Sequence, residues 1–71
     1  MDQWTETPES SNLQRFMYNE ESQVLTVEFK NGGVYEYYDV PVNIYEDLVH
    51  ADSKGSYLYH YIKGSFRYSK Q

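Results

Sequence analysis

The chain has 71 residues, no cysteine and a net charge of −5. A chain of this length forms one small domain that buries only about 60% of its unfolded surface. The lack of cysteine excludes disulfides and thiolate metal sites. Because small secreted domains usually need such cross-links, their absence favours a cytoplasmic protein. No apolar run approaches the roughly 20 residues of a membrane span, and the acidic, polar N-terminus is unlike a signal peptide.

The charge is distributed unevenly along the chain. Residues 1–52 hold all eleven acidic residues against two basic ones, Arg15 and Lys30, which is a net charge of −9. Residues 53–71 hold four basic residues and no acidic one, which is a net charge of +4. The chain therefore has an acidic body and a basic C-terminal quarter, and only the latter suits an anionic partner.

The N-terminal segment lacks hydrophobic periodicity. We expect residues 1–10 to form a flexible tail and residues 11–71 to form a single domain. Trp4 is the large apolar residue of this tail. It either docks on the domain or stays free, and we favour a free side chain.

The first predicted strand runs from Leu13 to Tyr18. The polar residues 19–22 are read as a four-residue turn. Such a turn sets Tyr18 opposite Gln23 and Phe16 opposite Leu25, so Phe16 and Tyr18 are predicted to lie on the core face.

Residues 23–41 are predicted to form a β-hairpin. Apolar and polar residues alternate up to Phe29, and Asn31-Gly32 is a strong turn signal because both residues tolerate a positive φ. Loop length then decides which side chains are buried. A two-residue loop would set Glu36 opposite Val27 and bury an unpaired carboxylate, which is costly.

A three-residue loop with Gly32 left-handed avoids that cost. It sets Tyr35 opposite Val27 and Tyr37 opposite Leu25, so both tyrosines join the apolar face. A tyrosine can bury its ring if its hydroxyl finds one partner. We therefore predict the three-residue loop, with Glu36 and Tyr38 on the opposite face.

After Pro41 the pattern changes from period two to a helical period. Residues 42–50 are predicted to form a helix whose inward stripe contains Ile44, Tyr45, Leu48 and Val49. Ser53 is a suitable N-cap for a second helix over residues 54–63, which Gly64 ends. Its inward stripe is predicted to contain Tyr57, Leu58, Tyr61 and Ile62. Gly55, unfavourable in a helix, indicates a close approach of another segment.

Residues 65–69 alternate aromatic and polar residues and are predicted to form a short fourth strand at the edge of the sheet. The whole pattern predicts an α+β fold. It consists of a three-stranded antiparallel meander followed by two short helices packed on one face and a short C-terminal strand.

These residues resemble a known family. The stretch 10–68, about four-fifths of the chain, resembles the KTSC domain, a short module found at the C-terminus of some lysyl-tRNA synthetases and as stand-alone bacterial and phage proteins. The likeness rests on Ser10-Ser11, Tyr18, Leu25-x-Val27-x-Phe29, Asn31-Gly32, Tyr35-x-Tyr37, Val40-Pro41, Tyr45, Ala51-x-Ser53-x-Gly55, Tyr57, Ile62 and Tyr68. The resemblance implies RNA binding through the synthetase context, and it implies no catalytic or ligand residues.

No pattern of an enzyme is present. There is no nucleophile elbow and no Gly-rich phosphate loop. Asp47, His50 and Asp52 lie close together in sequence, but a metal site needs a third or fourth well-placed ligand, and His50 fits a favourable contact with a helix C-terminus. We therefore predict a monomeric, non-enzymatic protein with no metal, cofactor, small-molecule substrate or membrane contact.

Two binding functions remain. The favoured one is a protein-interaction module, and the alternative is an RNA-binding module for single strands, in which basic residues neutralise phosphates and exposed rings stack on bases. For either partner, the predicted surface is the outward side of the second helix and the strand after it, with locally uncompensated charges. Its residues are Lys54, Tyr59, His60, Lys63, Arg67 and Lys70.

Overall fold

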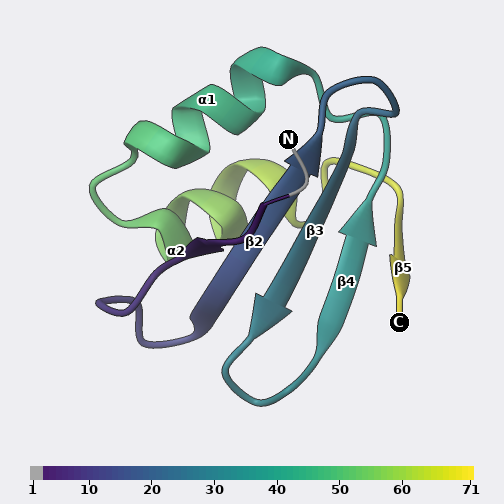
Figure 1. The fold of residues 1–71 in the computed structure, drawn as a ribbon. Helices are drawn as coiled ribbons and strands as arrows, with labels where there is room; N and C mark the ends of the chain where they lie inside the picture. The colour runs from purple at the N-terminus through teal and green to yellow at the C-terminus, as the bar shows by residue number, and fades with distance from the viewer. Residues whose placement is uncertain (1–2) are drawn as a thin grey trace.

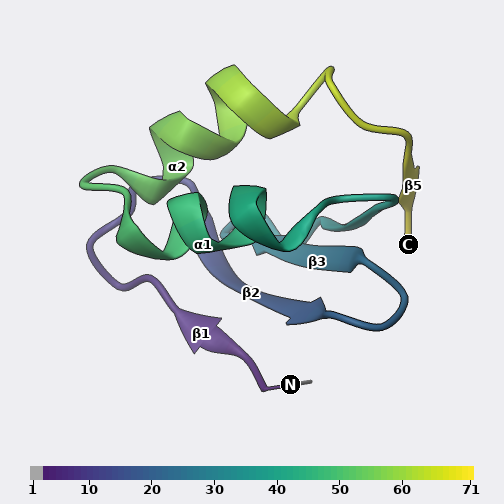
Figure 2. The same cartoon turned by 90° about the horizontal axis from the view of Figure 1, so that it is seen from above.

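The computed structural model describes residues 3–71 as an α+β fold with one sheet and one layer of helices. The five strands are antiparallel and lie in chain order, and the helices cover one face of the sheet (Figures 1 and 2). Within these residues, no helix combines the length and apolar character needed to cross a membrane. The elements are β1 (Thr5–Glu6), β2 (Leu13–Asn19), β3 (Val24–Phe29), β4 (Val34–Tyr37), α1 (Val42–His50), α2 (Lys54–Tyr57), the π-helical segment η1 (Leu58–Ile62) and β5 (Tyr68–Lys70).

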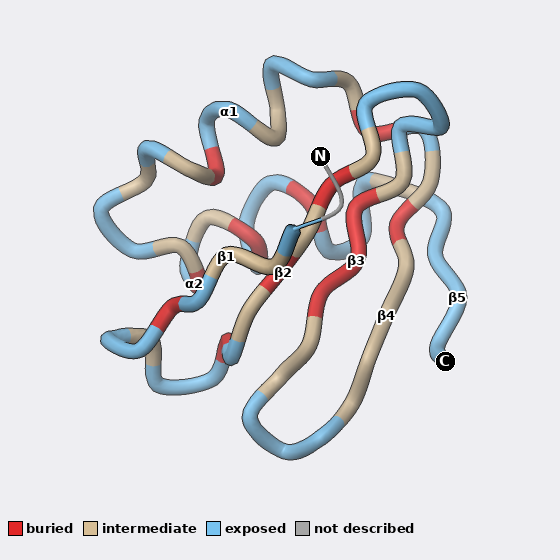
Figure 3. Tube along the Cα trace, viewed as in Figure 1, coloured by how far each residue is buried: buried red, intermediate tan, exposed pale blue. Residues whose placement is uncertain are grey.

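The core lies between the sheet and the helices. The buried residues of β2 and β3 dominate it, and β5 is exposed along its length (Figure 3). The helical layer contributes the buried side chains of Leu48, Leu58 and Ile62. The full set of buried hydrophobic residues is Leu13, Phe16, Tyr18, Leu25, Val27, Tyr37, Val40, Leu48, Leu58 and Ile62.

The β3–β4 hairpin has the predicted three-residue loop. Leu25 pairs with Tyr37 and Val27 pairs with Tyr35, as the loop-length argument requires. Gly32 has a φ of +95°, which is the left-handed conformation that glycine adopts at little cost. Tyr37 is buried in the core and Tyr35 is half-buried beside it, so the assignment of both rings to the core face is confirmed.

The register between β2 and β3 differs from the predicted one by two residues. Phe16 lies opposite Val27, and Tyr18 lies opposite Leu25 rather than Gln23. The reason is the turn. Gln23 has a φ of +59° and its N–H donates to the carbonyl of Asn19 at 2.8 Å, so the loop covers residues 20–23. A shift of two residues preserves the faces, and Phe16 and Tyr18 are both buried as predicted.

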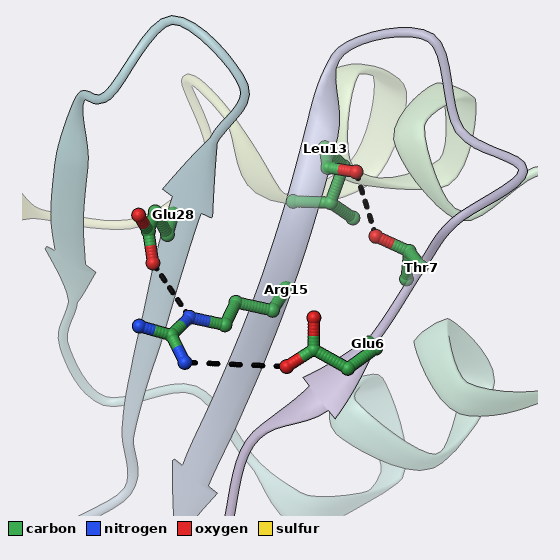
Figure 4. A network of polar contacts seen from close by, with 5 residues as sticks. All are labelled: Glu6, Thr7, Leu13, Arg15 and Glu28. Atoms are coloured by element: carbon green, nitrogen blue, oxygen red, sulfur yellow. Dashed lines mark hydrogen bonds and ion pairs between the residues drawn. The ribbon is translucent and has the colours of Figure 1, made fainter.

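Part of the predicted tail is an edge strand. Strand β1 pairs with β2, with Glu6 opposite Arg15. The Arg15 guanidinium lies 2.6 Å from the Glu28 carboxylate and 4.0 Å from that of Glu6, so it connects three strands (Figure 4). The buried Thr7 hydroxyl donates to the carbonyl of Leu13 at 2.7 Å. A strand of two residues held by polar contacts has no hydrophobic period, which is why the sequence pattern missed it.

Trp4 is not free in the structure. Its ring lies 4.1 Å from the guanidinium carbon of Arg15, which is a cation–π contact, and its side chain is half-buried. The expectation of a free side chain is therefore wrong. Residues 1–2 of the predicted tail lie outside the described residues.

The first helix is confirmed at its predicted bounds, and Leu48 of its inward stripe is buried. Ser53 caps the second helix as predicted, accepting a hydrogen bond from the N–H of Ser56 at 3.4 Å. The helix then changes to a π-helical turn, in which the N–H of Lys63 donates to the carbonyl of Leu58. The extra residue in this turn rotates the following side chains. Tyr61, predicted to face inward, is consequently 60% exposed.

Gly55 marks a close approach, as predicted. It is buried, and a Cβ atom at this position would lie 2.5 Å from Oδ1 of Asn12 and 3.0 Å from Oγ of Ser10. The loop before β2 is thus packed directly against the start of α2. Farther along, Gly64 ends the helix with a φ of +88°. The last strand lies at the sheet edge as predicted, but it covers residues 68–70 rather than 65–69, and its pairing with β4 was not predicted.

Three tyrosine hydroxyls have a pKa above the usual value of 10.0. Burial is the main cause for each, and it is reinforced by Glu20 for Tyr18, by Tyr35 and Tyr68 for Tyr37, and by Asp47 for Tyr57. The Tyr18 hydroxyl donates to the carbonyl of Val40 at 2.5 Å. Ionisation of Tyr18 would remove this hydrogen-bond donor, so the folded state favours the neutral hydroxyl.

These shifts predict that the fold is lost in alkali. Since the pKa values are raised in the folded state, the unfolded chain gives up its phenolic protons first, and the stabilisation is complete below about pH 10 and declines above it. We expect the urea midpoint to be constant near neutral pH and to fall above about pH 10. Tyr18→Phe, which removes one titrating group, should make that fall less steep. An unchanged midpoint up to about pH 11 would contradict the assignment.

Candidate functional site

A cleft of about 610 Å³ opens on the helix-side face of the sheet. It lies where the β3–β4 hairpin, β5 and the residues after η1 come together. Its walls carry four aromatic side chains and two lysines, and none of the acidic residues among 3–71 lines it. We call it the aromatic cleft and define it by Phe29, Tyr35, Tyr37, Tyr68, Lys30 and Lys63.

The strand register places these rings together. Tyr68 of β5 lies opposite Tyr37 of β4, and directly opposite residues share a face. The ring of Tyr35 is 5.8 Å from that of Tyr68 and 5.6 Å from that of Phe29. Exposure rises across the cleft, from 2% for Tyr37 to 56% for Tyr68. The inner ring therefore anchors the cleft in the core, and the outer one offers a face to a ligand.

The lysines at the cleft form no ion pair with an acidic residue of the described part of the chain. The Lys30 ammonium donates to the backbone carbonyls of Ser10 and Pro8. The Lys63 ammonium lies 5.6 Å from the centre of the Tyr59 ring. Lys70 lies opposite Tyr35 in the register and so shares its face. Within residues 3–71, none of these three lysines forms an ion pair, so this face keeps its positive charge.

The other face of the sheet is polar, and its two arginines are paired with carboxylates. Glu28 and Glu36 alternate with core residues along their strands and therefore point to this side. Glu28 pairs with Arg15. Arg67 lies 3.4 Å from the Asp39 carboxylate, with its guanidinium 5.2 Å from the Tyr38 ring. Unpaired positive charge thus gathers on the cleft side of the sheet.

The structure separates the residues of the predicted surface. Lys63 lines the cleft, Lys70 shares its face, and Tyr59 contacts Lys63. His60 is exposed beside Tyr59, with the rings 5.4 Å apart. Lys54 lies at the other end of the helical segment, where its ammonium donates to the carbonyl of Ala51 at 3.3 Å. Arg67 is on the opposite sheet face and is paired with Asp39, so the expectation that its charge is uncompensated is wrong.

Five of the residues that define the cleft were absent from the predicted surface: Phe29, Lys30, Tyr35, Tyr37 and Tyr68. The alternation around Arg67 does put Tyr68 on the face opposite to Arg67, which is the signal that was available. It gives no information about which strand lies beside Tyr68. That neighbour depends on where β5 joins the sheet, a contact between residues far apart in sequence.

The described part of the chain contains no cluster of three or more histidine, cysteine, aspartate or glutamate side chains arranged to hold a metal ion. Asp47 instead accepts a hydrogen bond from the Tyr57 hydroxyl at 3.5 Å, which links α1 to α2. The aromatic cleft therefore offers rings, ammonium groups and hydroxyls as its chemistry. These groups bind anions and flat apolar surfaces.

Comparisons with known proteins agree with this fold. A family model described as "KTSC domain" matches residues 9–66. Lysine–tRNA ligases of Trichormus variabilis and Nostoc punctiforme are each 44% identical over 63 residues, which is 89% of this chain and 11% of each ligase. The chain thus spans about a tenth of the length of these relatives. A protein of Tsukamurella paurometabola is 36% identical over 83% of this chain and 88% of its own length.

A solved structure has the same architecture. The crystal structure of a KTSC domain protein from Yersinia pestis superposes with a TM-score of 0.91 at 29% sequence identity, covering 97% of this chain and 96% of that one. The predicted α+β fold is therefore found in an experimental structure of a similar protein.

Proposed function

The chain belongs to the KTSC domain family, whose matched relatives include a segment of lysine–tRNA ligases, and from this premise we propose that it is a non-enzymatic, cytoplasmic module that binds single-stranded RNA in the aromatic cleft. One observation carries the proposal. Four aromatic rings and two lysines line one cleft, and no carboxylate of the described residues 3–71 lines it.

The cleft chemistry fits the two parts of a nucleotide. An exposed ring such as Tyr68 stacks on an unpaired base, which contributes about 1–3 kcal/mol per base. The ammonium groups of Lys30 and Lys63 neutralise the adjoining phosphates. Both kinds of group line the same cleft, as a ligand with alternating bases and phosphates requires.

A single strand fits better than a duplex. Duplex RNA exposes backbone and minor-groove edges, whereas loops and ends expose the base faces that rings can stack on. The chain as a whole carries a charge of −5. Long-range repulsion therefore opposes the local attraction, and we expect weak binding that decreases steeply with salt.

A second candidate is the protein-interaction module that the sequence favoured. The rings of Tyr57 and Tyr61 pack 4.8 Å apart outside the aromatic cleft, and Tyr61 is 60% exposed. An exposed pair of rings suits an apolar partner surface. This function would be favoured by a pull-down that captures one discrete protein. The capture should persist after nuclease treatment and should be lost with Tyr61→Ala.

Titration with short oligouridine at low salt tests the RNA proposal. We expect amide shifts in the ¹H–¹⁵N spectrum to concentrate on residues of the aromatic cleft. Tyr68→Ala removes the most exposed stacking face of the cleft and should weaken binding by about 1–3 kcal/mol, which is roughly five- to 150-fold in Kd.

The matched control is Tyr38→Ala, which removes a half-buried ring from the opposite sheet face. It should leave the affinity unchanged. The proposal is wrong if oligouridine shifts no residue of the cleft at low salt, or if the two variants weaken binding equally while both retain the native spectrum.

A further inference from the structure

We propose that the RNA strand continues from the aromatic cleft past Lys63 to a second stacking position on Tyr59, so that the ligand is a run of several unpaired nucleotides rather than one base. This inference rests on the proposed function and specifies its ligand. It requires that the two stacking positions be joined by one continuous surface.

Lys63 joins the two positions. It lines the aromatic cleft, and its ammonium also lies 5.6 Å from the centre of the Tyr59 ring. The surface therefore presents a ring, an ammonium group and a second ring in the order Tyr68, Lys63, Tyr59. A single strand presents a base, a phosphate and a base, which is the complementary order.

The loop before β2 joins the two positions from the other side. Ser11 and Asn12 line the aromatic cleft and also a second cleft of about 470 Å³ that reaches Tyr59. Gly55 lines this second cleft together with Asn12, and its missing side chain lets Oδ1 of Asn12 approach the helix backbone closely. Amide and hydroxyl groups suit the 2′-hydroxyls and base edges that distinguish RNA from DNA.

Tyr59 is presented outward and supported from one side. Its side chain is 62% exposed, and the His60 ring meets it nearly at a right angle, with the centroids 5.4 Å apart. Tyr59 lies in the π-helical segment, and such segments are rare and frequent at functional sites. Among residues 3–71, Tyr59 does not belong to the hydrophobic residues packed against the core, so its ring is free to stack on a ligand.

The second cleft also limits the strand. Glu9 is among its lining residues, and its carboxylate would repel a further phosphate. We therefore expect the strand to leave the surface after Tyr59. An acidic peptide fits this surface less well, because it would satisfy Lys63 but offer no flat face to Tyr68 or Tyr59.

The experiment compares ligands of different length on the intact chain. Uridine monophosphate, diuridylate and hexauridylate are titrated against the parent protein and Tyr59→Ala at one low salt concentration. We expect hexauridylate to bind the parent at least about tenfold more tightly than the monophosphate does, and Tyr59→Ala to lose about five- to 150-fold for hexauridylate alone.

Tyr61→Ala is the matched control, because Tyr61 is equally exposed on the same segment and lines neither cleft. It should leave all three affinities unchanged. The inference is overturned if Tyr59→Ala binds hexauridylate like the parent, or if oligoglutamate binds as tightly as hexauridylate. Binding of the short ligands with no effect of Tyr59→Ala would overturn the inference alone, whereas no binding of any ligand would overturn the proposed function with it.

Discussion

Tyr37→Ala is expected to remove a large part of the domain's stability and to lower its denaturation midpoint strongly. The Tyr37 ring is 2% exposed and lies opposite Leu25 in the core. Truncating a buried aromatic side chain to alanine costs about 3–5 kcal/mol. A domain of this size has a total stability of the same order, about 4–11 kcal/mol at 0.05–0.15 kcal/mol per residue. Urea or thermal unfolding followed by circular dichroism measures the loss.

Tyr38→Ala is the control for this prediction, because Tyr38 is the next residue and lies on the other sheet face. Its half-buried ring contacts Arg67, and its hydroxyl donates to the Glu36 carboxylate at 3.1 Å. Removing these surface contacts should cost no more than about 1 kcal/mol. If the two variants lowered the denaturation midpoint equally, the assignment of Tyr37 and Tyr38 to opposite faces of the sheet would be wrong.

Reversing both cleft lysines should abolish RNA binding. Lys30→Glu with Lys63→Glu replaces the two positive charges that line the aromatic cleft with negative ones. A hydrogen bond to a charged group contributes about 1.5–3 kcal/mol, so each lost phosphate contact should weaken binding about tenfold or more. The milder pair Lys30→Gln and Lys63→Gln should bind weakly and with a shallower salt dependence. Fluorescence anisotropy of labelled oligouridine at several salt concentrations measures both effects.

Arg67→Glu provides the comparison. It also reverses a basic residue of the C-terminal quarter, but Arg67 is on the opposite sheet face and pairs with Asp39. It should change RNA affinity far less than the double lysine variant. Comparable losses from both variants would indicate that net charge, rather than the cleft, attracts the ligand, and would contradict the proposed site.

Much of the architecture follows from the sequence by local rules. The hairpin register depends only on the loop length and on the cost of burying Glu36, and Leu25 lies opposite Tyr37 as that argument required. The bounds of α1 follow from Pro41 and the apolar stripe. Gly55 and Gly64 have the roles that a residue without a side chain suggests. For the hairpin and for α1 the deciding residues lie close together along the chain, whereas Ser10 and Asn12, the partners of Gly55, are distant in sequence.

The remaining features depend on contacts between distant segments. Strand β1 exists because Arg15 and the carbonyl of Leu13 offer partners to Glu6 and Thr7, which no local pattern of residues 1–10 reveals. The π-helical turn exposes Tyr61 while Leu58 and Ile62 stay buried. It breaks the helical period from which the inward stripe was predicted.

The candidate site is the clearest case of such dependence. The sequence predicted a binding surface in the basic, aromatic C-terminal quarter. Of its residues, Lys63 lines the aromatic cleft and Tyr59 contacts Lys63. Only the docking of β5 beside β4 brings Tyr68 to Tyr35 and carries Arg67 to the other face. The reason is that residue types along the chain set which faces are apolar, whereas pairing between distant strands sets which apolar and charged groups meet.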